Sequence, residues 1–260
     1  RPAAHGGAVA RGTGRATGRV RGRAVGGGGE YERATQMTWH PDIPEAYRNQ
    51  IVTGDARALA AQIPDESIDL IFTDPVYERI EDYAWLAETA ARVLKPNSAC
   101  LAFCSIAQLP ETLAAMSQSL SYRWQFIEYR TNEVKHRHAP GGKCVYAPLL
   151  WFDKGKRRPS FVLDVRAVAV HTSKSNHLWS KPPITIMYYL TAFSQTEAVV
   201  YDPFVGGGTT AVIAKTSGRN FIASEIDPTR AAAARTRLEN TQAMHPLFVT
   251  DQAELDLSAA

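Results

Sequence analysis

Short apolar runs alternate along this chain with longer segments whose apolar residues recur at helical spacing. The helical spacing is clearest where Leu86, Ala90, Val93 and Leu94 form one stripe that stops before Pro96. Strands are expected at residues 51–53, 68–73, 98–104, 124–129, 145–152, 198–202 and 220–225, and helices around 86–94, 107–120, 183–193, 209–217 and 228–240. Such alternation predicts an α/β fold with a Rossmann-like, doubly wound, mostly parallel sheet.

Composition divides the chain into a folded domain at 37–245 and two tails, at 1–36 and 246–260. Residues 1–33 contain seven arginines and two glutamates, a local charge of +5, whereas the rest of the chain carries −2. The first tail is rich in Gly, Arg and Ala, so it cannot bury enough apolar surface to offset its ordering entropy, and we expect disorder in isolation. It is either a phosphate-binding arm or a linker without function, and the second interpretation is favoured.

Bulk properties favour a soluble intracellular enzyme. At 260 residues the chain is long enough to bury a large core. Its apolar runs are shorter than the roughly 20 residues of a membrane helix, and no secretory segment is recognised. Three cysteines without metal-ligand spacing indicate a reducing compartment rather than a disulfide framework, and no metal site is expected.

A glycine-rich segment, Asp202-Pro-Phe-Val-Gly-Gly-Gly-Thr-Thr210, follows the apolar run at 198–201. Glycines after a buried strand let the backbone approach a ligand, and the following helix N-terminus offers unpaired N–H groups. Glu225 ends the next predicted strand, where an acid can accept hydrogen bonds from ribose hydroxyls. A dehydrogenase fingerprint and a glycine turn without a ligand are alternatives, and the few residues that follow argue against the first.

The second segment, Asp74-Pro-Val-Tyr77, follows the apolar run at 68–72. Such a segment could act on the exocyclic amino group of a nucleic-acid base. The nitrogen of that group is a poor nucleophile, because its lone pair is delocalised into the ring of the base. The Asp74 carboxylate and the Pro75 carbonyl could accept its hydrogens and stabilise the charge that develops during methyl transfer. Tyr77 offers a flat surface on which an extruded base can stack. Asp-Pro turns at strand ends are also common without function.

In this order, the two segments make the chain similar to the β group of N6-adenine/N4-cytosine DNA methyltransferases, over about residues 48–240. The segments at 51–55, 149–155, 177–182 and 224–227 extend the resemblance. It implies the S-adenosylmethionine-dependent methyltransferase fold with a small, loop-rich recognition insert at about 155–176. It assigns catalysis to Asp74, Pro75 and Tyr77. It assigns cofactor binding to Asp55, Lys181, Asp202, Phe204, Gly206, Gly208, Thr209, Thr210 and Glu225.

The expected reaction is methyl transfer from S-adenosylmethionine to adenine N6 in double-stranded DNA, with the target base flipped out. Alternatives are methylation of cytosine N4 or of RNA, and a catalytically weak or inactive cofactor- and DNA-binding subunit. Val76, where the family usually has a second proline, and the short insert motivate the inactive subunit. The protein could form a homodimer or bind a second subunit. We expect it in the cytoplasm of a bacterium, or of a cell that expresses a phage or mobile-element gene. The candidate DNA contacts are Lys135, Arg137, Lys143, Lys156, Arg157 and Arg158.

Overall fold

A single mixed sheet organises the chain in the computed structural model, which describes residues 39–131, 135–139, 142–156, 159, 162–168 and 181–241, with side chains left out at 135–143. The predicted tails lie outside the described residues. The eight strands of the sheet are β1 (Gln50–Thr53), β2 (Ile68–Thr73), β3 (Leu94–Phe103), β4 (Ser121–Arg130), β7 (Tyr146–Lys154), β8 (Val165–Val168), β9 (Val199–Asp202) and β10 (Asn220–Glu225). They lie in the order β1-β10-β9-β2-β3-β7-β4-β8.

Only β7 runs antiparallel to its neighbours in this sheet. The predicted Rossmann-like, mostly parallel α/β fold is therefore confirmed. The strands that form the centre of the sheet are mostly apolar: in β2, four of the six side chains are buried aliphatic or aromatic residues. Such continuous apolar runs are typical of parallel strands that are covered on both faces.

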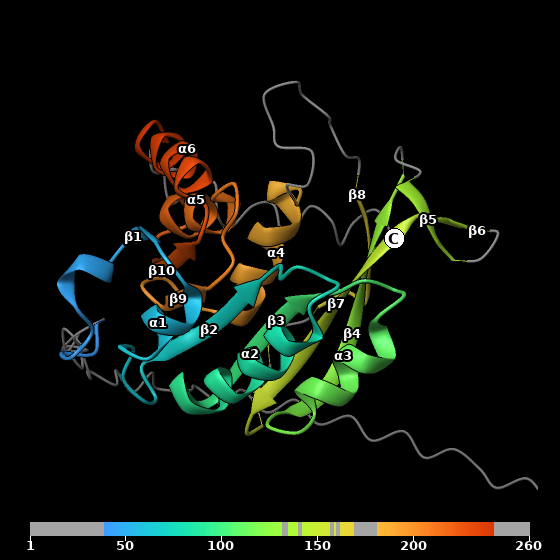
Figure 1. Cartoon of the computed structure of the whole chain (residues 1–260), viewed down its shortest axis with the longest axis horizontal. Helices are drawn as coiled ribbons and strands as arrows, with labels where there is room; N and C mark the ends of the chain where they lie inside the picture. The colour runs from blue at the N-terminus through green and yellow to red at the C-terminus, as the bar shows by residue number, and fades with distance from the viewer. Residues whose placement is uncertain are drawn as a thin grey trace, which may run out of the picture. The chain divides into compact units, whose positions relative to one another are not determined.

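Helices cover both faces of the sheet and form two separate apolar cores (Figure 1). One core involves α1 (Ala56–Ala60), α2 (Ile80–Val93) and α3 (Leu109–Met116). The other involves α4 (Pro183–Phe193), α5 (Thr209–Thr216) and α6 (Pro228–Glu239). A 3-10 turn, Glu45–Tyr47, precedes β1. Among the described residues, no helix combines the length and apolar character that a membrane crossing requires.

Three elements of the sheet region were not predicted from the sequence. The first two are β5 (Lys135–Ala139) and β6 (Gly142–Cys144), which form a separate two-stranded hairpin between β4 and β7. The third is β8, which lies inside the stretch expected to be a loop-rich insert; it pairs in parallel with β4 and forms one edge of the sheet. The residues of the two hairpin strands are mostly Lys, His, Arg and Gly, and β8 has only four residues. None of the three strands therefore has a clear alternation of apolar and polar positions.

Candidate functional site

The two sequence motifs follow neighbouring strands. β2 and β9 pair in parallel, with Leu70 opposite Val200 and Ile71 opposite Tyr201. The chain leaves β2 through Asp74 and leaves β9 through Asp202, so both turns lie at the carboxyl edge of the sheet. β1 and β10 end at the same edge, because they run parallel to β9. Ligands of open α/β sheets bind outside the carboxyl ends of strands, where the strand order changes direction.

Asp202 joins the two motifs from the interior. Its side chain is 3% exposed, and its Oδ1 accepts a hydrogen bond from the Thr73 hydroxyl at 2.6 Å, directly before Asp74. The same oxygen accepts the Phe204 N–H at 3.1 Å, and the Thr210 hydroxyl also bonds to this carboxylate. Burial raises the pKa of Asp202 to about 6, and the three donors partly oppose that rise. The carboxylate thus connects the end of β2, the glycine-rich turn and the start of α5.

The glycine-rich turn depends on backbone angles that favour glycine. Gly206 has φ +52° and Gly208 has φ +79°, both in the left-handed region. A Cβ built on Gly208 would lie 3.0 Å from the Cβ of Ala234 in α6, whereas one built on Gly206 would meet no described atom within 4 Å. Gly208 therefore permits close packing between α5 and α6, and Gly206 faces open space.

Side chains on α5 and α6 hold this turn in place. Thr209 and Thr210 are buried in the first turn of α5. Arg237 donates one hydrogen bond to the Gly207 carbonyl and another to the Thr209 hydroxyl, each at 3.0 Å. Phe204 lies edge-on to Trp85 of α2, with ring centroids 5.8 Å apart. The sequence did not identify Arg237 or Trp85 as parts of the site, because neither belongs to a motif.

Two acidic residues follow the outer parallel strands. Glu225 ends β10, is 7% exposed, and accepts the Asp227 N–H through Oε1 at 2.9 Å. Asp55 follows β1 and caps α1, since its Oδ1 accepts the Arg57 N–H at 2.9 Å. The Gly54 N–H bonds to the Glu225 carbonyl at 3.0 Å. The structure thus brings both acids to the edge of the sheet that carries the glycine-rich turn.

The Asp74-to-Tyr77 segment forms a compact polar cluster with Lys181. The Tyr77 hydroxyl donates to Asp74 Oδ1 at 2.9 Å and accepts from Lys181 Nζ at 2.8 Å, while Lys181 Nζ also forms an ion pair with Asp74 Oδ2. The Lys181 side chain is 7% exposed and that of Asp74 is 31% exposed. Burial and the neighbouring Asp74 carboxylate raise the pKa of Tyr77 well above its ordinary value. The phenol is therefore a neutral hydrogen-bond donor at physiological pH.

Pro75 and Val76 differ in their environment. Pro75 is buried, whereas the Val76 side chain is 54% exposed. The Val76 carbonyl accepts the Arg79 N–H at 3.1 Å, so the motif continues into a turn that leads to α2. A side chain this exposed gains little from packing, and the backbone here is fixed mainly by Pro75 and by that turn.

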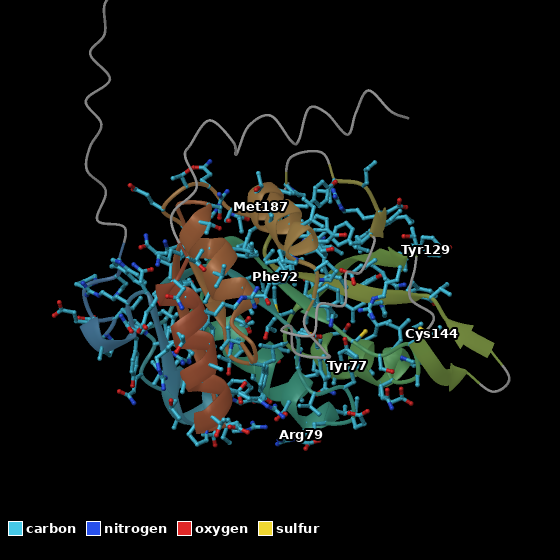
Figure 2. All side chains as sticks on the ribbon, turned by 90° about the horizontal axis from the view of Figure 1, so that it is seen from above. Phe72, Tyr77, Arg79, Tyr129, Cys144 and Met187 are labelled. Atoms are coloured by element: carbon cyan, nitrogen blue, oxygen red, sulfur yellow. The ribbon has the colours of Figure 1, made fainter. Side chains whose placement is uncertain are left out.

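The basic candidates for DNA contact separate into two groups. Lys135, Arg137 and Lys143 belong to the β5–β6 hairpin, which extends from the carboxyl edge because β4 ends and β7 begins there (Figures 1 and 2). Lys156 lies at the opposite edge, since Lys154 pairs with Ser98 at the start of β3. The two groups therefore lie at different edges of the sheet, and DNA contact by Lys156 stays a prediction. Arg157 and Arg158 lie outside the described residues.

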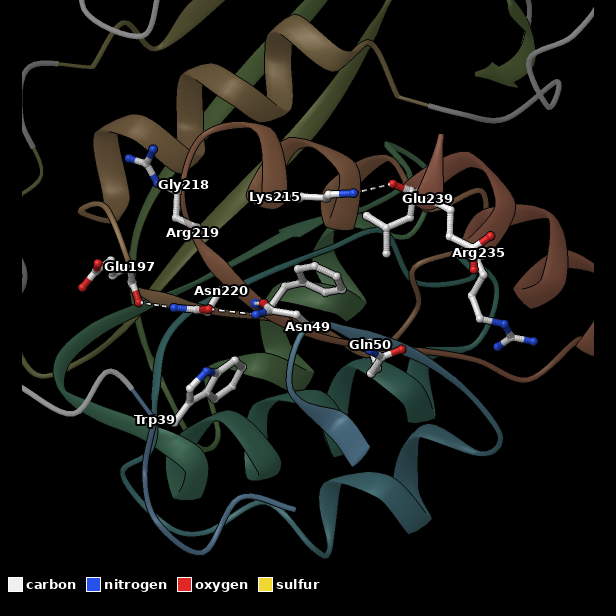
Figure 3. Close-up of a pocket in the computed structure, with 12 residues that line it drawn as sticks. Trp39, Asn49, Gln50, Glu197, Lys215, Gly218, Arg219, Asn220, Arg235 and Glu239 are labelled. Carbon is white, nitrogen blue, oxygen red and sulfur yellow. Dashed lines mark hydrogen bonds between the residues drawn. The ribbon is translucent and has the colours of Figure 1, made fainter. Parts of the chain in front are cut away.

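A cavity of about 700 Å³ lies away from both motifs (Figure 3). Its lining includes Gln50 and Asn220, the first residues of β1 and β10, and therefore belongs to the amino edge of the sheet. Polar side chains bridge this edge, as the Asn49 amide donates to Asn220 at 3.0 Å. The cavity is separate from the ends of β2 and β9.

A sheet of this order, with a glycine-rich turn and an Asp-Pro motif on adjacent strand ends, defines a methyltransferase of the α/β class. Residues 68–236 match the family model described as DNA methylase, and the chain belongs to that family. The family expected from the sequence is thereby confirmed. The residue roles inferred from it stay predictions.

Relatives and solved structures include enzymes of both amino-group specificities. The DNA adenine methyltransferase YhdJ of Escherichia coli (strain K12) is 25% identical over 231 residues, which cover 68% of this chain and 78% of that protein. The M1.HpyAVI–SAM complex superposes with a TM-score of 0.62 at 21% identity, covering 73% of this chain and 98% of the other. The cytosine-N4-specific PvuII DNA methyltransferase has a TM-score of 0.64 at 17% identity, covering 81% and 93%.

Proposed function

We propose that this protein transfers a methyl group from S-adenosylmethionine to the N6 amino group of adenine in DNA. The observation that supports this most strongly is the hydrogen bond between Thr73 and Asp202. It joins the strand end that carries Asp74 to the strand end that carries the glycine-rich turn. A methyl donor bound at that turn would face a base held at Asp74.

The groups gathered at the carboxyl edge suit the chemistry of S-adenosylmethionine. The open side of Gly206 leaves room for close approach to the backbone, and the start of α5 presents N–H groups. Glu225 is assigned to the ribose hydroxyls, Asp55 to the adenine region, and Phe204 to apolar contact with the ligand. Gly208, Thr209, Thr210 and Asp202 would shape the turn, because all four are packed into the interior. When bound, S-adenosylmethionine supplies the methyl group from its sulfonium.

The chemical step is assigned to Asp74, Pro75 and Tyr77. The Asp74 carboxylate and the Pro75 carbonyl accept the two amino hydrogens and orient the nitrogen lone pair toward the methyl carbon. They also stabilise the positive charge that the nitrogen acquires, and the surplus proton then leaves to solvent. Tyr77 stacks on the flipped base, after its hydroxyl has given up Asp74 Oδ1 to the amino group. No covalent enzyme intermediate is needed.

DNA contact is assigned to the β5–β6 hairpin, because this element extends from the edge that carries Asp74 and contains Lys135, Arg137 and Lys143. Cations next to the catalytic edge favour phosphate binding and hold the duplex while a base is extruded. Lys156, at the opposite edge, would contact DNA only with a partner or a long duplex. A homodimer or a second subunit would enlarge the short recognition surface.

Two other functions remain candidates, each for a specific reason. Methylation of cytosine N4 is one, because an N4-specific enzyme is among the structural neighbours. A weak or inactive DNA-binding subunit is the other, because Val76 replaces a proline of the catalytic motif. Methylation of RNA has no separate support among the described contacts.

One experiment tests all of these functions together. The chain is expressed in bacteria that lack their own DNA methyltransferases, and their DNA is sequenced with detection of modified bases. The proposal expects N6-methyladenine in a defined sequence context, and none with the Asp74→Ala variant. N4-methylcytosine would correct the base, whereas unmodified DNA from cells with abundant folded protein would reject the activity.

A further inference from the structure

Lys181 contacts the catalytic motif rather than the glycine-rich turn. It lies two residues before α4, and its ammonium group reaches Asp74 Oδ2 and the Tyr77 hydroxyl. The ammonium also lies 4.3 Å from the centre of the Phe103 ring and 5.3 Å from that of Tyr77. A nearly buried cation with these partners is held in one place, directly beside the carboxylate assigned to the target amino group.

Among the described residues, the hydrogen bonds of Lys181 account for two of its three N–H donors. An ammonium group has three donors. Among the described residues, Asp74 and Tyr77 are its only hydrogen-bond partners, and they use two of these donors. The third N–H therefore lies next to the Asp74 carboxylate, so that a donor and an acceptor stand side by side at the catalytic motif.

We propose that Lys181 and Asp74 together select bases that carry an amino group next to an unprotonated ring nitrogen. Adenine has this pair in N6 and N1, and cytosine has it in N4 and N3. Asp74 would accept the amino hydrogen while Lys181 donates to the ring nitrogen. Thymine and uracil have the opposite arrangement on their Watson–Crick edge, a carbonyl next to a ring N–H, and so has guanine at O6 and N1; the Asp74 carboxylate would then face the carbonyl and the Lys181 ammonium would face the N–H. Guanine has an amino group beside an unprotonated ring nitrogen only at N2 and N3, on its sugar edge. This inference rests on the proposed function.

Lys181 would also hold the carboxylate while the base enters. In the structure, the Tyr77 hydroxyl occupies Asp74 Oδ1, which is the position that an amino N–H would take. Displacing Tyr77 leaves Oδ2 paired with Lys181, so the carboxylate keeps its orientation. Lys181 is thus assigned as a residue that touches the substrate and determines which base is accepted.

The test removes the two partners of the proposed hydrogen bond separately and together. The substrate is a DNA duplex with the target site mapped in cells, containing either adenine or 1-deazaadenine, in which a C–H replaces N1. If the mapped base is cytosine, 3-deazacytosine takes this place. Single-turnover methyl transfer is measured with the wild-type protein, Lys181→Met and Lys215→Met. Lys215 is the control, because its Nζ bonds to the Leu238 carbonyl in α6, at 2.8 Å.

We expect 1-deazaadenine to slow the wild type and Lys215→Met by about 10- to 100-fold, the effect of losing a hydrogen bond to a charged donor. Lys181→Met should methylate adenine slowly. Its rate on 1-deazaadenine should be lower than its rate on adenine by less than about threefold. The analogue also alters the reactivity of its own amino group, but that change is common to all three proteins and cancels in the comparison. Lys181→Gln, which retains an N–H donor, should keep part of the sensitivity.

Two results would overturn the assignment of Lys181. The first is an equal penalty from the analogue in the wild type and in both Lys181 variants. The second is a pair of results for Lys181→Met: weaker S-adenosylmethionine binding in calorimetry, and the same loss of rate on the deaza base as in the wild type. That pair would assign the lysine to the cofactor carboxylate instead. Both leave the proposed function intact. A wild type that methylates no base in any mapped site would reject the proposed function itself.

Discussion

Two aspartates end neighbouring strands of the same sheet, and each precedes a proline, yet their surroundings are opposite. Asp202 is buried and bonds to uncharged donors: the Thr73 and Thr210 hydroxyls and the Phe204 N–H. Asp74 is partly exposed and pairs with a lysine and a tyrosine. The same dipeptide at the same edge of the sheet thus stabilises the interior in one case, and in the other it presents a carboxylate that the proposed function assigns to the target base.

Removing each carboxylate should separate these two roles, and the largest effect is expected at Asp74. Asp74→Ala removes an acceptor of the target amino group, so single-turnover methyl transfer should fall by about 1,000-fold. Asp74→Asn keeps one acceptor oxygen and should lose about tenfold. S-adenosylmethionine affinity, measured by calorimetry, should change by less than threefold in either variant. Unchanged turnover in Asp74→Ala would rule out the assigned chemistry.

At Asp202 the main effect should be on stability and its pH dependence. Because burial raises the pKa of Asp202 to about 6, the folded state binds this proton more tightly than the unfolded state, whose pKa is near 3.8. Wild-type stability should therefore fall as pH rises from about 4 to about 6, by about 2 kcal/mol from this group. The Asn side chain of Asp202→Asn does not titrate, so the stability of this variant should lack this pH-dependent contribution.

The measurement is urea unfolding of both proteins between pH 4 and pH 7.5. The free energy of unfolding of Asp202→Asn, relative to the wild type, should increase by about 2 kcal/mol across that range. Asp42→Asn is the control, because the Asp42 side chain is 79% exposed. A difference between Asp202→Asn and the wild type that stays constant with pH would show that the buried carboxylate does not titrate in this way.

The two aspartates also show which features of the fold and the site can be predicted from the sequence. Apolar runs located the main parallel strands, and the glycines and Asp-Pro segments located the carboxyl edge. Whether an aspartate is buried depends on side chains remote in the chain, such as the Thr73 hydroxyl 129 residues from Asp202. Lys181 was expected near the cofactor from its motif alone, and its contact with Asp74 follows from the path into α4. Short polar strands such as β5 and β6 carry no periodic signal, so they were missed.

The glycine-rich turn offers a matched pair that sharpens the contrast on a smaller scale. Gly208→Ala should lower the free energy of unfolding by about 2–3 kcal/mol, because it combines left-handed strain with a clash against Ala234. Gly206→Ala has no such neighbour and should cost about 1 kcal/mol. Its methyl group would instead obstruct a ligand on the backbone, and S-adenosylmethionine affinity should fall by about tenfold or more. Equal affinities for the wild type and Gly206→Ala would place the cofactor elsewhere.

The smallest effect is expected at Val76, two residues after Asp74. Proline at this position would restrict both its own φ and the conformations of Pro75, and so hold the Pro75 carbonyl more firmly toward the amino group. The exposed Val76 side chain contributes little packing that could be lost, and its carbonyl, which accepts the Arg79 N–H, is retained. Val76→Pro should therefore raise the single-turnover rate about three- to fivefold with unchanged cofactor affinity. Val76→Ala is the control, because it shortens the same exposed side chain without restricting the backbone, and it should leave the rate unchanged. A slower Val76→Pro enzyme would mean that the valine backbone is already in the productive conformation, and that the departure from the family motif carries no catalytic cost.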